Sequence, residues 1–290
     1  MPVVQPSQTV SDALHTATSM LSRVSESPRL DAELLLEYVT GLSRTAFRTT
    51  PERGLPAQAG WAFQQLVMRR LKGEPIAYIR GQQEFWSLLL EVTPAVLIPR
   101  PETELVVERA LEHLAGSATA RVLDLGTGSG AIALALANQL PAIQMVASDA
   151  SKEALAVAAR NAGRLQVTNV TFMLSNWFAA LPEALFDVIV SNPPYVAAND
   201  PDLSAEVRRT EPGMALIPGP TGFEAIESIV RESPRYLAPN GWLVLEHGWK
   251  QAATVRDLLV RTGFTHVRSH ADLAGHERVT EARRETGQER

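Results

Sequence analysis

The sequence predicts an α/β protein with a doubly wound, mostly parallel sheet and a small N-terminal helical bundle domain. Two observations support this prediction. From residue 98 onwards, short apolar segments alternate with helical patterns, which is typical of a parallel sheet covered by helices on both faces. The first 80 residues carry only amphipathic helical patterns. We therefore expect two domains in this chain of 290 residues.

Three apolar stripes predict the helices of the N-terminal domain, residues 1–80. The first runs from Val10 to Val24, the second follows the start signal Ser27-Pro28, and the third follows Pro56. We expect the three helices to pack on one another as a bundle. No residue in these stripes requires a chemical role, so we expect a scaffold or a domain that docks a partner.

The rest of the chain divides into a linker, a sheet domain and a tail. Residues 81–97 predict a β-hairpin linker that turns at Thr93-Pro94. Residues 98–281 form the α/β domain, and the Arg- and Glu-rich residues 282–290 predict a frayed polar tail. The strands are expected in the apolar runs 121–125, 144–148, 170–173, 186–191 and 242–246. Ligands of such sheets bind beyond the carboxyl ends of the strands.

Composition excludes several classes of site. The net charge of −5 argues against a general nucleic-acid binder, so we expect no stable nucleic-acid binding. The chain has no cysteine, and its six histidines lack the spacing of metal ligands, so we expect no metal. No apolar run approaches the ~20 residues of a membrane span, and the first thirty residues hold no signal-peptide core. We therefore expect a cytoplasmic protein without membrane contact.

A glycine-rich loop, Asp124 to Gly130 (DLGTGSG), follows the first strand of the α/β domain and opens into a helix. Glycines let the backbone turn tightly and approach a ligand, and the helix N-terminus offers N–H groups to an anionic group. Asp149 ends the next strand, about 20 residues further on, where an acid can accept hydrogen bonds from a ribose diol. With Ala131 the loop also matches the G-x-G-x-x-A dinucleotide fingerprint, so an NAD-dependent dehydrogenase is an open alternative.

A stiff polar corner, Asn192-Pro193-Pro194-Tyr195, follows the strand expected at 186–191. The two prolines fix φ and lack N–H donors, while their carbonyl oxygens stay available as acceptors. The Asn192 side chain and the Pro193 carbonyl can each accept one hydrogen from an amide or amino group, with Tyr195 packed on its face. The same residues are also ordinary in a turn that ends a strand.

Four motifs together resemble the protein glutamine methyltransferases that act on peptide-chain release factors. They are residues 98–104 (IPRPETE), 124–130 (DLGTGSG), 191–195 (SNPPY) and 245–248 (LEHG). The resemblance covers about Gly73 to Val279, and the helical N-terminal domain also fits it. It implies a Rossmann-like methyltransferase that moves a methyl group from S-adenosylmethionine to a glutamine side-chain amide and leaves S-adenosylhomocysteine. It also implies release factors as the partners, docked by residues 1–80.

The resemblance further implies roles for single residues. The cofactor-binding residues would be Gly126, Thr127, Gly128, Ser129, Gly130, Asp149, Trp177 and Asn192. The residues that hold the substrate glutamine would be Asn192, Pro193, Pro194 and Tyr195, of which Asn192, Pro193 and Tyr195 would be catalytic. By composition alone, Trp177 could equally be a core aromatic residue. Three positions depart from the family pattern: Asn176, where an acid is common beside the adenine, Gly213, and residues 276–278.

Three other functions share these features. A ribosomal-protein glutamine methyltransferase would differ in the partner that the N-terminal domain selects. An adenine amino-group methyltransferase of DNA or RNA would use the same corner for a flipped base. A cofactor-sensing module would bind the cofactor without turnover.

Overall fold

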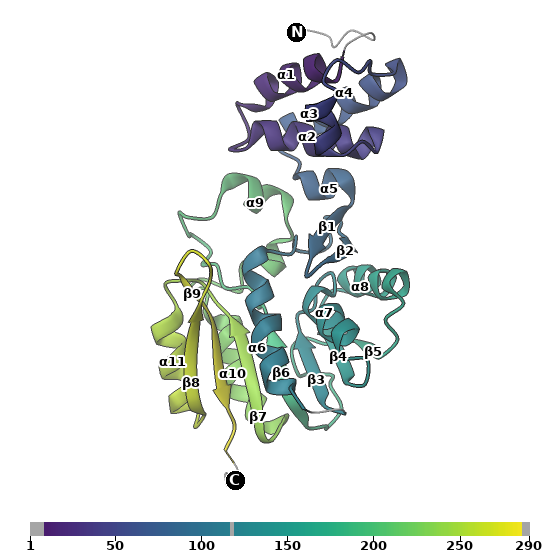
Figure 1. Cartoon of the computed structure of the whole chain (residues 1–290). Coiled ribbons are helices and arrows are strands. Elements are labelled where there is room, and N and C mark those ends of the chain that lie inside the picture. Colours follow the sequence, from purple (N-terminus) through teal and green to yellow (C-terminus); the bar gives the residue numbers. More distant parts are fainter. Residues whose placement is uncertain (1–8, 117–118, 286–290) are drawn as a thin grey trace. The chain divides into compact units, whose positions relative to one another are not determined.

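The computed structural model describes residues 9–116 and 119–285. The chain divides into two compact units between Gln82 and Gln83. The first unit is helical, whereas the second is built on a sheet (Figure 1). The first unit has one apolar core, and the second has an apolar core on each face of its sheet. Within the described residues, no helix combines the length and the apolar character that a bilayer crossing requires.

The helices of the first unit are α1 (Val10–Leu21), α2 (Pro28–Thr40), α3 (Arg44–Thr49), α4 (Ala57–Leu71) and α5 (Ile76–Arg80). Thr9 caps α1 through reciprocal hydrogen bonds with Asp12, and Gly41 ends α2 with a φ of 67°. Helices α1, α2 and α4 confirm the three predicted stripes. The sequence does not predict α3 and α5, because such short segments do not show a helical period.

A hairpin begins the second unit, but its turn differs from the prediction. Strands β1 (Gln82–Phe85) and β2 (Leu88–Glu91) pair in a two-stranded sheet, so the predicted turn at Thr93-Pro94 is wrong. The turn lies at Trp86 and Ser87, which have φ values of 51° and 60°, as a two-residue hairpin turn requires. Carboxylates hold this turn without glycine, because Glu104 accepts the Trp86 N–H and Glu84 the Ser87 N–H, both at 2.8 Å.

The second unit contains a seven-stranded sheet of order β5-β4-β3-β6-β7-β9-β8. Its strands are β3 (Arg121–Leu125), β4 (Gln144–Asp149), β5 (Val170–Leu174), β6 (Phe186–Ser191), β7 (Leu237–Glu246), β8 (Thr265–Ala271) and β9 (Glu277–Arg283). Neighbouring strands from β5 to β7 are parallel, and β9 is antiparallel to β7 and β8. The strand order reverses between β3 and β6, and this confirms the doubly wound, mostly parallel sheet.

The last two strands were not visible in the sequence as an apolar run. Strand β9 extends to Arg283, and Ala282 is fully buried opposite Leu243, so the predicted polar tail cannot begin at residue 282. The pairing with β7 orders this segment although most of its side chains are polar. The predicted frayed end, residues 286–290, lies outside the described residues.

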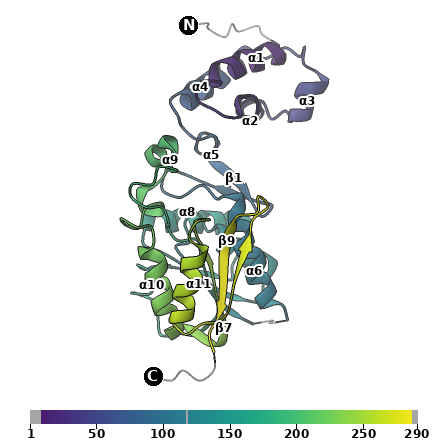
Figure 2. The ribbon, with the colours of Figure 1, turned by 90° about the vertical axis from the view of Figure 1, so that its left-hand side faces the viewer.

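Helices cover both faces of the sheet. They are α6 (Glu104–Leu114), α7 (Ala131–Gln139), α8 (Lys152–Leu165), α10 (Glu224–Glu232) and α11 (Ala252–Arg261). The short helix α9 (Ala205–Thr210) has no buried residue and belongs to the segment that follows β6. Alternation along β6 sends Val188 and Val190 into the core under α6 and α7, and Ile189 into the core under α10 and α11. Figure 2 shows α6 on one side of the strands and α10 and α11 on the other.

Candidate functional site

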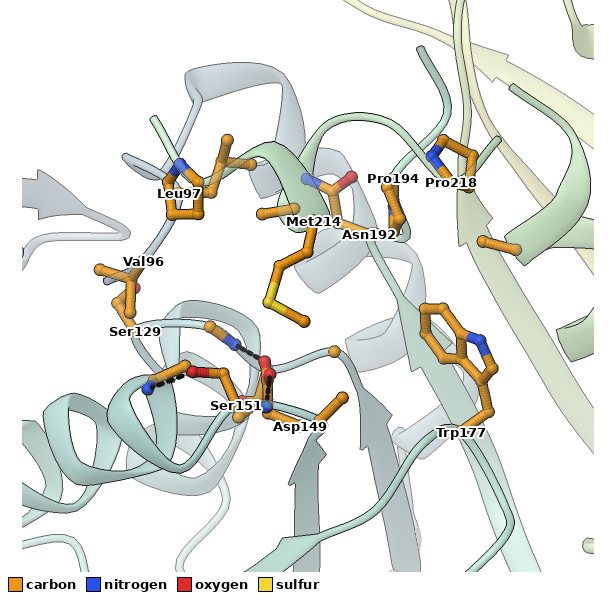
Figure 3. Close-up of a pocket in the computed structure, with 18 of the residues that line it drawn as sticks. Val96, Leu97, Ser129, Asp149, Ser151, Trp177, Asn192, Pro194, Met214 and Pro218 are labelled. Atoms are coloured by element: carbon orange, nitrogen blue, oxygen red, sulfur yellow. Dashed lines mark hydrogen bonds between the residues drawn. The ribbon is translucent and has the colours of Figure 1, made fainter. Parts of the chain in front are cut away.

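A cavity of about 590 Å³ opens at the carboxyl ends of β3, β4 and β6, entirely within the second unit (Figure 3). This is the edge of the sheet where the strand order reverses, as expected for a ligand site. Its size lies within the range of ~300–1,000 Å³ that is usual for small-molecule sites. The sequence-predicted residues that line it are Gly126, Thr127, Gly128, Ser129, Asp149, Trp177, Asn192 and Pro194.

The glycine loop is held by bonds to the neighbouring strand. Gly126 and Thr127 both donate their N–H groups to the Ser148 carbonyl at 2.9 Å, and Gly130 donates to the Thr127 carbonyl at 2.8 Å. These three N–H groups therefore close the loop. Gly126 has a φ of 74°, and a Cβ atom there would lie 3.5 Å from the Trp177 ring. The loop thus contributes a close backbone surface to the cavity.

Asp149 joins the loop to the next strand. Its Oδ2 atom accepts the Gly128 N–H at 2.9 Å, and its Oδ1 atom accepts the Ser151 N–H at 2.9 Å (Figure 3). Burial raises the pKa of Asp149, and these backbone donors oppose the rise. Each carboxylate oxygen has a second lone pair, so the side chain can still accept two hydroxyl groups from the cavity.

The far wall of the cavity is aromatic and amide in character. Trp177 lies against Gly126 and lines the cavity together with Asn176. An indole face beside an amide group suits a planar heterocycle, because the ring can stack while the amide donates and accepts hydrogen bonds. Trp177 also packs against the core of the second unit, so the two interpretations of this residue are compatible.

The proline corner presents one polar side chain to the cavity. The Asn192 Nδ2 atom donates to the Thr103 hydroxyl at 3.0 Å, which leaves Oδ1 as the acceptor of this amide. Asn192 and Pro194 line the cavity. Pro193 is buried, and neither it nor Tyr195 lies among the lining residues. Tyr195 instead donates its hydroxyl to Glu246 Oε1 at 3.1 Å. Gly130 also lies outside the cavity lining.

The sequence interpretation assigned no role to two buried acids that contact residues of the site. Glu246 ends β7, is 1% exposed, and has a pKa raised to about 7 by burial. Glu211 is also buried. It accepts a hydrogen bond from the Ile98 N–H at 3.1 Å and forms an ion pair with Arg100. Glu211 thereby connects the two cavity walls at 95–99 and 212–218. Met214, which is 60% exposed, extends from the second wall into the cavity between Asp149 and Asn192 (Figure 3).

The residues present fit a nucleoside with a further group attached. Asp149 offers acceptors at the end of β4, Trp177 and Asn176 offer a stacking and hydrogen-bonding wall, and the glycine loop leaves space between them. The Asn192 acceptor lies in the same cavity. A cofactor and an amide or amino substrate can therefore meet there. Within the described residues, no group of three histidine, aspartate or glutamate side chains could hold a metal.

Comparisons with known families match both units. Residues 12–81 match the PrmC N-terminal domain, and residues 103–209 match the methyltransferase small domain. The T. thermophilus 16S rRNA methyltransferase RsmC, solved in complex with AdoMet and guanosine, aligns over 70% of this chain and 49% of its own, with a TM-score of 0.52 and 21% identity. The hMettl16 catalytic domain aligns over 70% of this chain and 77% of its own, with a TM-score of 0.55 and 17% identity. These likenesses confirm the Rossmann-like methyltransferase fold.

Sequence relatives are much closer. The release factor glutamine methyltransferase of Salmonella typhimurium is 49% identical over 92% of this chain and 96% of its own length. The Pseudomonas aeruginosa enzyme of the same name is 52% identical over 88% of this chain and 92% of its own. The Escherichia coli one is 45% identical over 92% and 96%. With identity this high over nearly the whole chain, and with both of its domains matched, the chain belongs to the family of release factor glutamine methyltransferases.

Proposed function

We propose that this chain transfers a methyl group from S-adenosylmethionine to the side-chain amide nitrogen of a glutamine in a peptide-chain release factor. The observation that carries the proposal is the fixed Asn192 amide. Its Nδ2 atom is engaged by Thr103, so its acceptor atom serves the same cavity as the glycine loop and Asp149. Family membership supports the choice of a glutamine as the amide.

In this proposal the cofactor lies along the carboxyl ends of β3 and β4. Asp149 accepts the ribose hydroxyls, Trp177 and Asn176 border the adenine, and the glycine loop contacts the methionine part. When bound, S-adenosylmethionine supplies an electrophilic methyl group on its sulfonium. Met214 covers the cavity with an apolar side chain and thereby helps to exclude water.

The reacting nitrogen of a glutamine amide is a poor nucleophile, because its lone pair is delocalised into the carbonyl. Asn192 Oδ1 accepts one amide hydrogen and the Pro193 carbonyl is proposed to accept the other, so that the nitrogen is oriented and its developing positive charge is stabilised. Holding the two reactants in line can contribute ~7–11 kcal/mol, and we assign much of the acceleration to this positioning. After the transfer the nitrogen loses one proton to water, so that the product is the neutral N-methylated amide.

The decisive experiment measures transfer of labelled methyl from S-adenosylmethionine to a purified release factor, followed by intact mass and peptide mapping. Duplex DNA and ribosomal proteins serve as competing substrates. A single methyl group on one glutamine of the release factor is expected. Label that appears only in nucleic acid would indicate adenine methylation instead. Label that appears only in a ribosomal protein would indicate the related protein methyltransferase activity. Cofactor binding without any label would indicate a cofactor-sensing module.

The Asn192→Ala variant tests the role of the corner in the same assay. We expect a fall in kcat of at least 100-fold with a cofactor affinity that changes much less, because the lost hydrogen bond acts on the reacting amide. Asn199→Ala is the matched control, since Asn199 is exposed and lies a few residues further along the same segment. Equal turnover in the Asn192→Ala variant would remove Asn192 from the mechanism.

A further inference from the structure

Glu246 is a buried carboxyl group directly behind the proline corner. It is the last residue of β7 and is 1% exposed. Its Oε1 atom accepts the Tyr195 hydroxyl at 3.1 Å, and the neighbouring Thr103 side chain lowers its pKa. Within the described residues, no hydrogen bond of ordinary geometry reaches Oε2. A buried acid with an incompletely satisfied oxygen is costly, which points to a role other than stability.

Thr103 is the partner of the Asn192 side chain that faces the cavity. Its hydroxyl oxygen accepts the Asn192 Nδ2–H at 3.0 Å, so its own hydrogen is free for another acceptor. Tyr195 donates to Glu246 Oε1, and among the residues that the structure describes Glu246 Oε2 is the unpartnered acceptor. A hydrogen bond from the Thr103 hydroxyl to Glu246 would join these groups in one chain of donors.

Two other charged groups act on Glu246, and they come from two different elements. Arg278 of β9 lowers its pKa, Glu102 of the 3-10 helix Pro101–Thr103 raises it, and burial outweighs both and raises it to about 7. The pKa of Tyr195 is raised by burial and then by the Glu246 charge, so Tyr195 stays protonated and remains the donor. Arg278 belongs to the segment 276–278 that departs from the family pattern and for which the sequence suggested no role.

We propose that Glu246 is a positioning residue for methyl transfer. It holds Tyr195 by a direct hydrogen bond, and it fixes Asn192 indirectly, through a hydrogen bond from the Thr103 hydroxyl. The inference rests on the proposed function, because it assigns a task to the same corner. With the carboxylate ionised, Thr103 must point its hydrogen at Glu246 and its oxygen at Asn192. The amide of Asn192 then presents oxygen to the substrate. Rotated by 180°, it would present its NH2 group to the substrate NH2 group, and two donors would face each other.

Protonation of Glu246 breaks this order of donors. A carboxylic acid is itself a donor, so it competes with the Thr103 and Tyr195 hydroxyls for acceptors, and the Thr103 hydroxyl is no longer held in one direction. Turnover should therefore require the ionised form. In the intact protein kcat is expected to rise with pH through a midpoint near 7, the value to which the Glu246 pKa is raised.

The test compares Glu246→Gln, Thr103→Val and Thr103→Ser with the unaltered full-length chain. The Glu246→Gln variant keeps the shape of the side chain but loses its charge. We expect its kcat to fall at least tenfold and the acid limb of its pH profile to disappear. Its cofactor affinity, measured by titration calorimetry, should change less than twofold. Thr103→Val should repeat the loss of kcat, and Thr103→Ser, which keeps the hydroxyl, should restore it. The Glu246→Gln/Thr103→Val double variant should be no worse than either single variant, because both act on one chain of hydrogen bonds.

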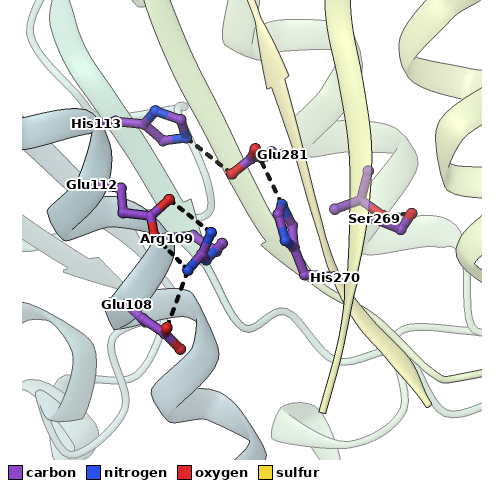
Figure 4. Close-up of polar contacts among 8 residues, drawn as sticks. Glu108, Arg109, Glu112, His113, Ser269, His270 and Glu281 are labelled. Carbon is purple, nitrogen blue, oxygen red and sulfur yellow. Dashed lines mark hydrogen bonds and ion pairs between the residues drawn. The ribbon is translucent and has the colours of Figure 1, made fainter. Parts of the chain in front are cut away.

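Glu281 provides the matched control for the loss of a buried acid. It lies on β9, 6% exposed, and pairs with His113 at 2.9 Å and His270 at 3.1 Å (Figure 4). Glu281 does not line the cavity. Glu281→Gln should therefore keep the wild-type kcat and the acid limb. Glu246→Gln with a kcat within twofold of wild type and an unchanged acid limb would overturn the proposal, as would an equal loss in Glu281→Gln.

A second measurement separates this inference from the proposed function. The side-chain amide signals of Asn192, followed by NMR with 15N-asparagine in the full chain saturated with S-adenosylhomocysteine, should shift with a midpoint near pH 7 and stop shifting in Glu246→Gln. This readout needs no protein substrate. If the unaltered chain methylates no release factor, the proposed function fails, while the Asn192 signals still decide whether Glu246 controls the corner. Signals that are independent of pH in the unaltered chain refute the inference.

Discussion

The Asp149 carboxylate accepts the Gly128 N–H at 2.9 Å, so the acid that ends β4 and the glycine loop that follows β3 are one hydrogen-bonded unit. A second backbone bond, from Ser151, fixes the other carboxylate oxygen. The acid therefore has two tasks, since it holds the loop in shape and offers its remaining lone pairs to the cavity. Any change at Asp149 should affect the cofactor and the loop together.

Asp149→Asn is expected to weaken S-adenosylmethionine binding by about 10- to 100-fold, because hydrogen bonds to a charged group contribute about 1.5–3 kcal/mol. The amide also replaces one acceptor by a donor, which would face the Gly128 or the Ser151 N–H. Titration calorimetry measures the affinity. Asp187→Asn is the control, since Asp187 also accepts a backbone N–H, that of Arg121 at 2.8 Å, but at the opposite ends of the strands. An unchanged affinity in Asp149→Asn would exclude Asp149 from the cofactor site.

Two glycines of the loop, Gly126 and Gly130, should respond differently to alanine. Gly126 has open space around its missing side chain apart from Trp177, whereas a Cβ atom on Gly130 would lie 2.9 Å from Leu134 and 3.3 Å from Ala158. Both have positive φ, which costs about 1–2 kcal/mol for alanine. We expect Gly130→Ala to lose about 1–3 kcal/mol more through overpacking, and Gly126→Ala to lose cofactor affinity instead.

Urea denaturation and calorimetry separate these two effects. Gly275→Ala gives the cost of positive φ alone, because Gly275 has a φ of 84° and no atom within 4 Å of the added methyl group. Equal stability of the Gly126→Ala and Gly130→Ala variants would mean that α7 shifts to accommodate the methyl group. The loop would then be less rigid than its hydrogen bonds indicate.

The parts of the site that could be predicted are those whose residues are consecutive in the sequence. DLGTGSG and NPPY each bring their groups together within one turn, so their place at the strand ends follows from the alternation of strands and helices. Glu246 and Thr103 could not be assigned in this way, because Thr103 meets Asn192 across 89 residues and Glu246 meets Tyr195 across 51. Only the folded sheet brings β7, the corner and residue 103 together.

The errors in the fold have a similar cause. The hairpin turn at Trp86 and Ser87 lacks the glycine or asparagine that usually marks positive φ, and its support comes from Glu104, which lies 18 residues away. Strand β9 carries Glu277, Arg278 and Glu281, so its composition resembles a polar tail. Its pairing with β7 and the partners of Glu281 order it, and neither is visible in a local pattern.

Stability should depend on pH through Glu281. Burial alone would raise its pKa, but His113 and His270 outweigh burial and lower the pKa below 4.5. A lowered pKa means that the ionised acid stabilises the folded chain above the unfolded value, and that this contribution is lost as the pH falls through the folded value. Glu281→Gln should therefore cost roughly 1–2 kcal/mol at pH 7, and the difference from the unaltered chain should shrink as the pH falls below about 4.5. Urea titrations at several pH values measure it, and a difference that still grows as the pH falls below about 4.5 would contradict the assignment.

The helical first unit is expected to dock the protein substrate, and Trp61 offers the sharpest test. Trp61 lies on α4 and is 65% exposed, and large exposed aromatic residues are typical anchors of protein interfaces. Trp61→Ala should raise KM for the release factor by roughly tenfold, the effect of losing about 1.4 kcal/mol of binding energy, with an unchanged kcat and cofactor affinity. Leu273→Ala is the control and should leave KM for the release factor unchanged, because Leu273 is fully exposed on the turn between β8 and β9 of the other unit. A short glutamine peptide lacks the rest of the release-factor surface that Trp61 would contact, so its KM should be the same with and without Trp61. If KM for the intact release factor is also unchanged, the docking surface does not include this face of α4.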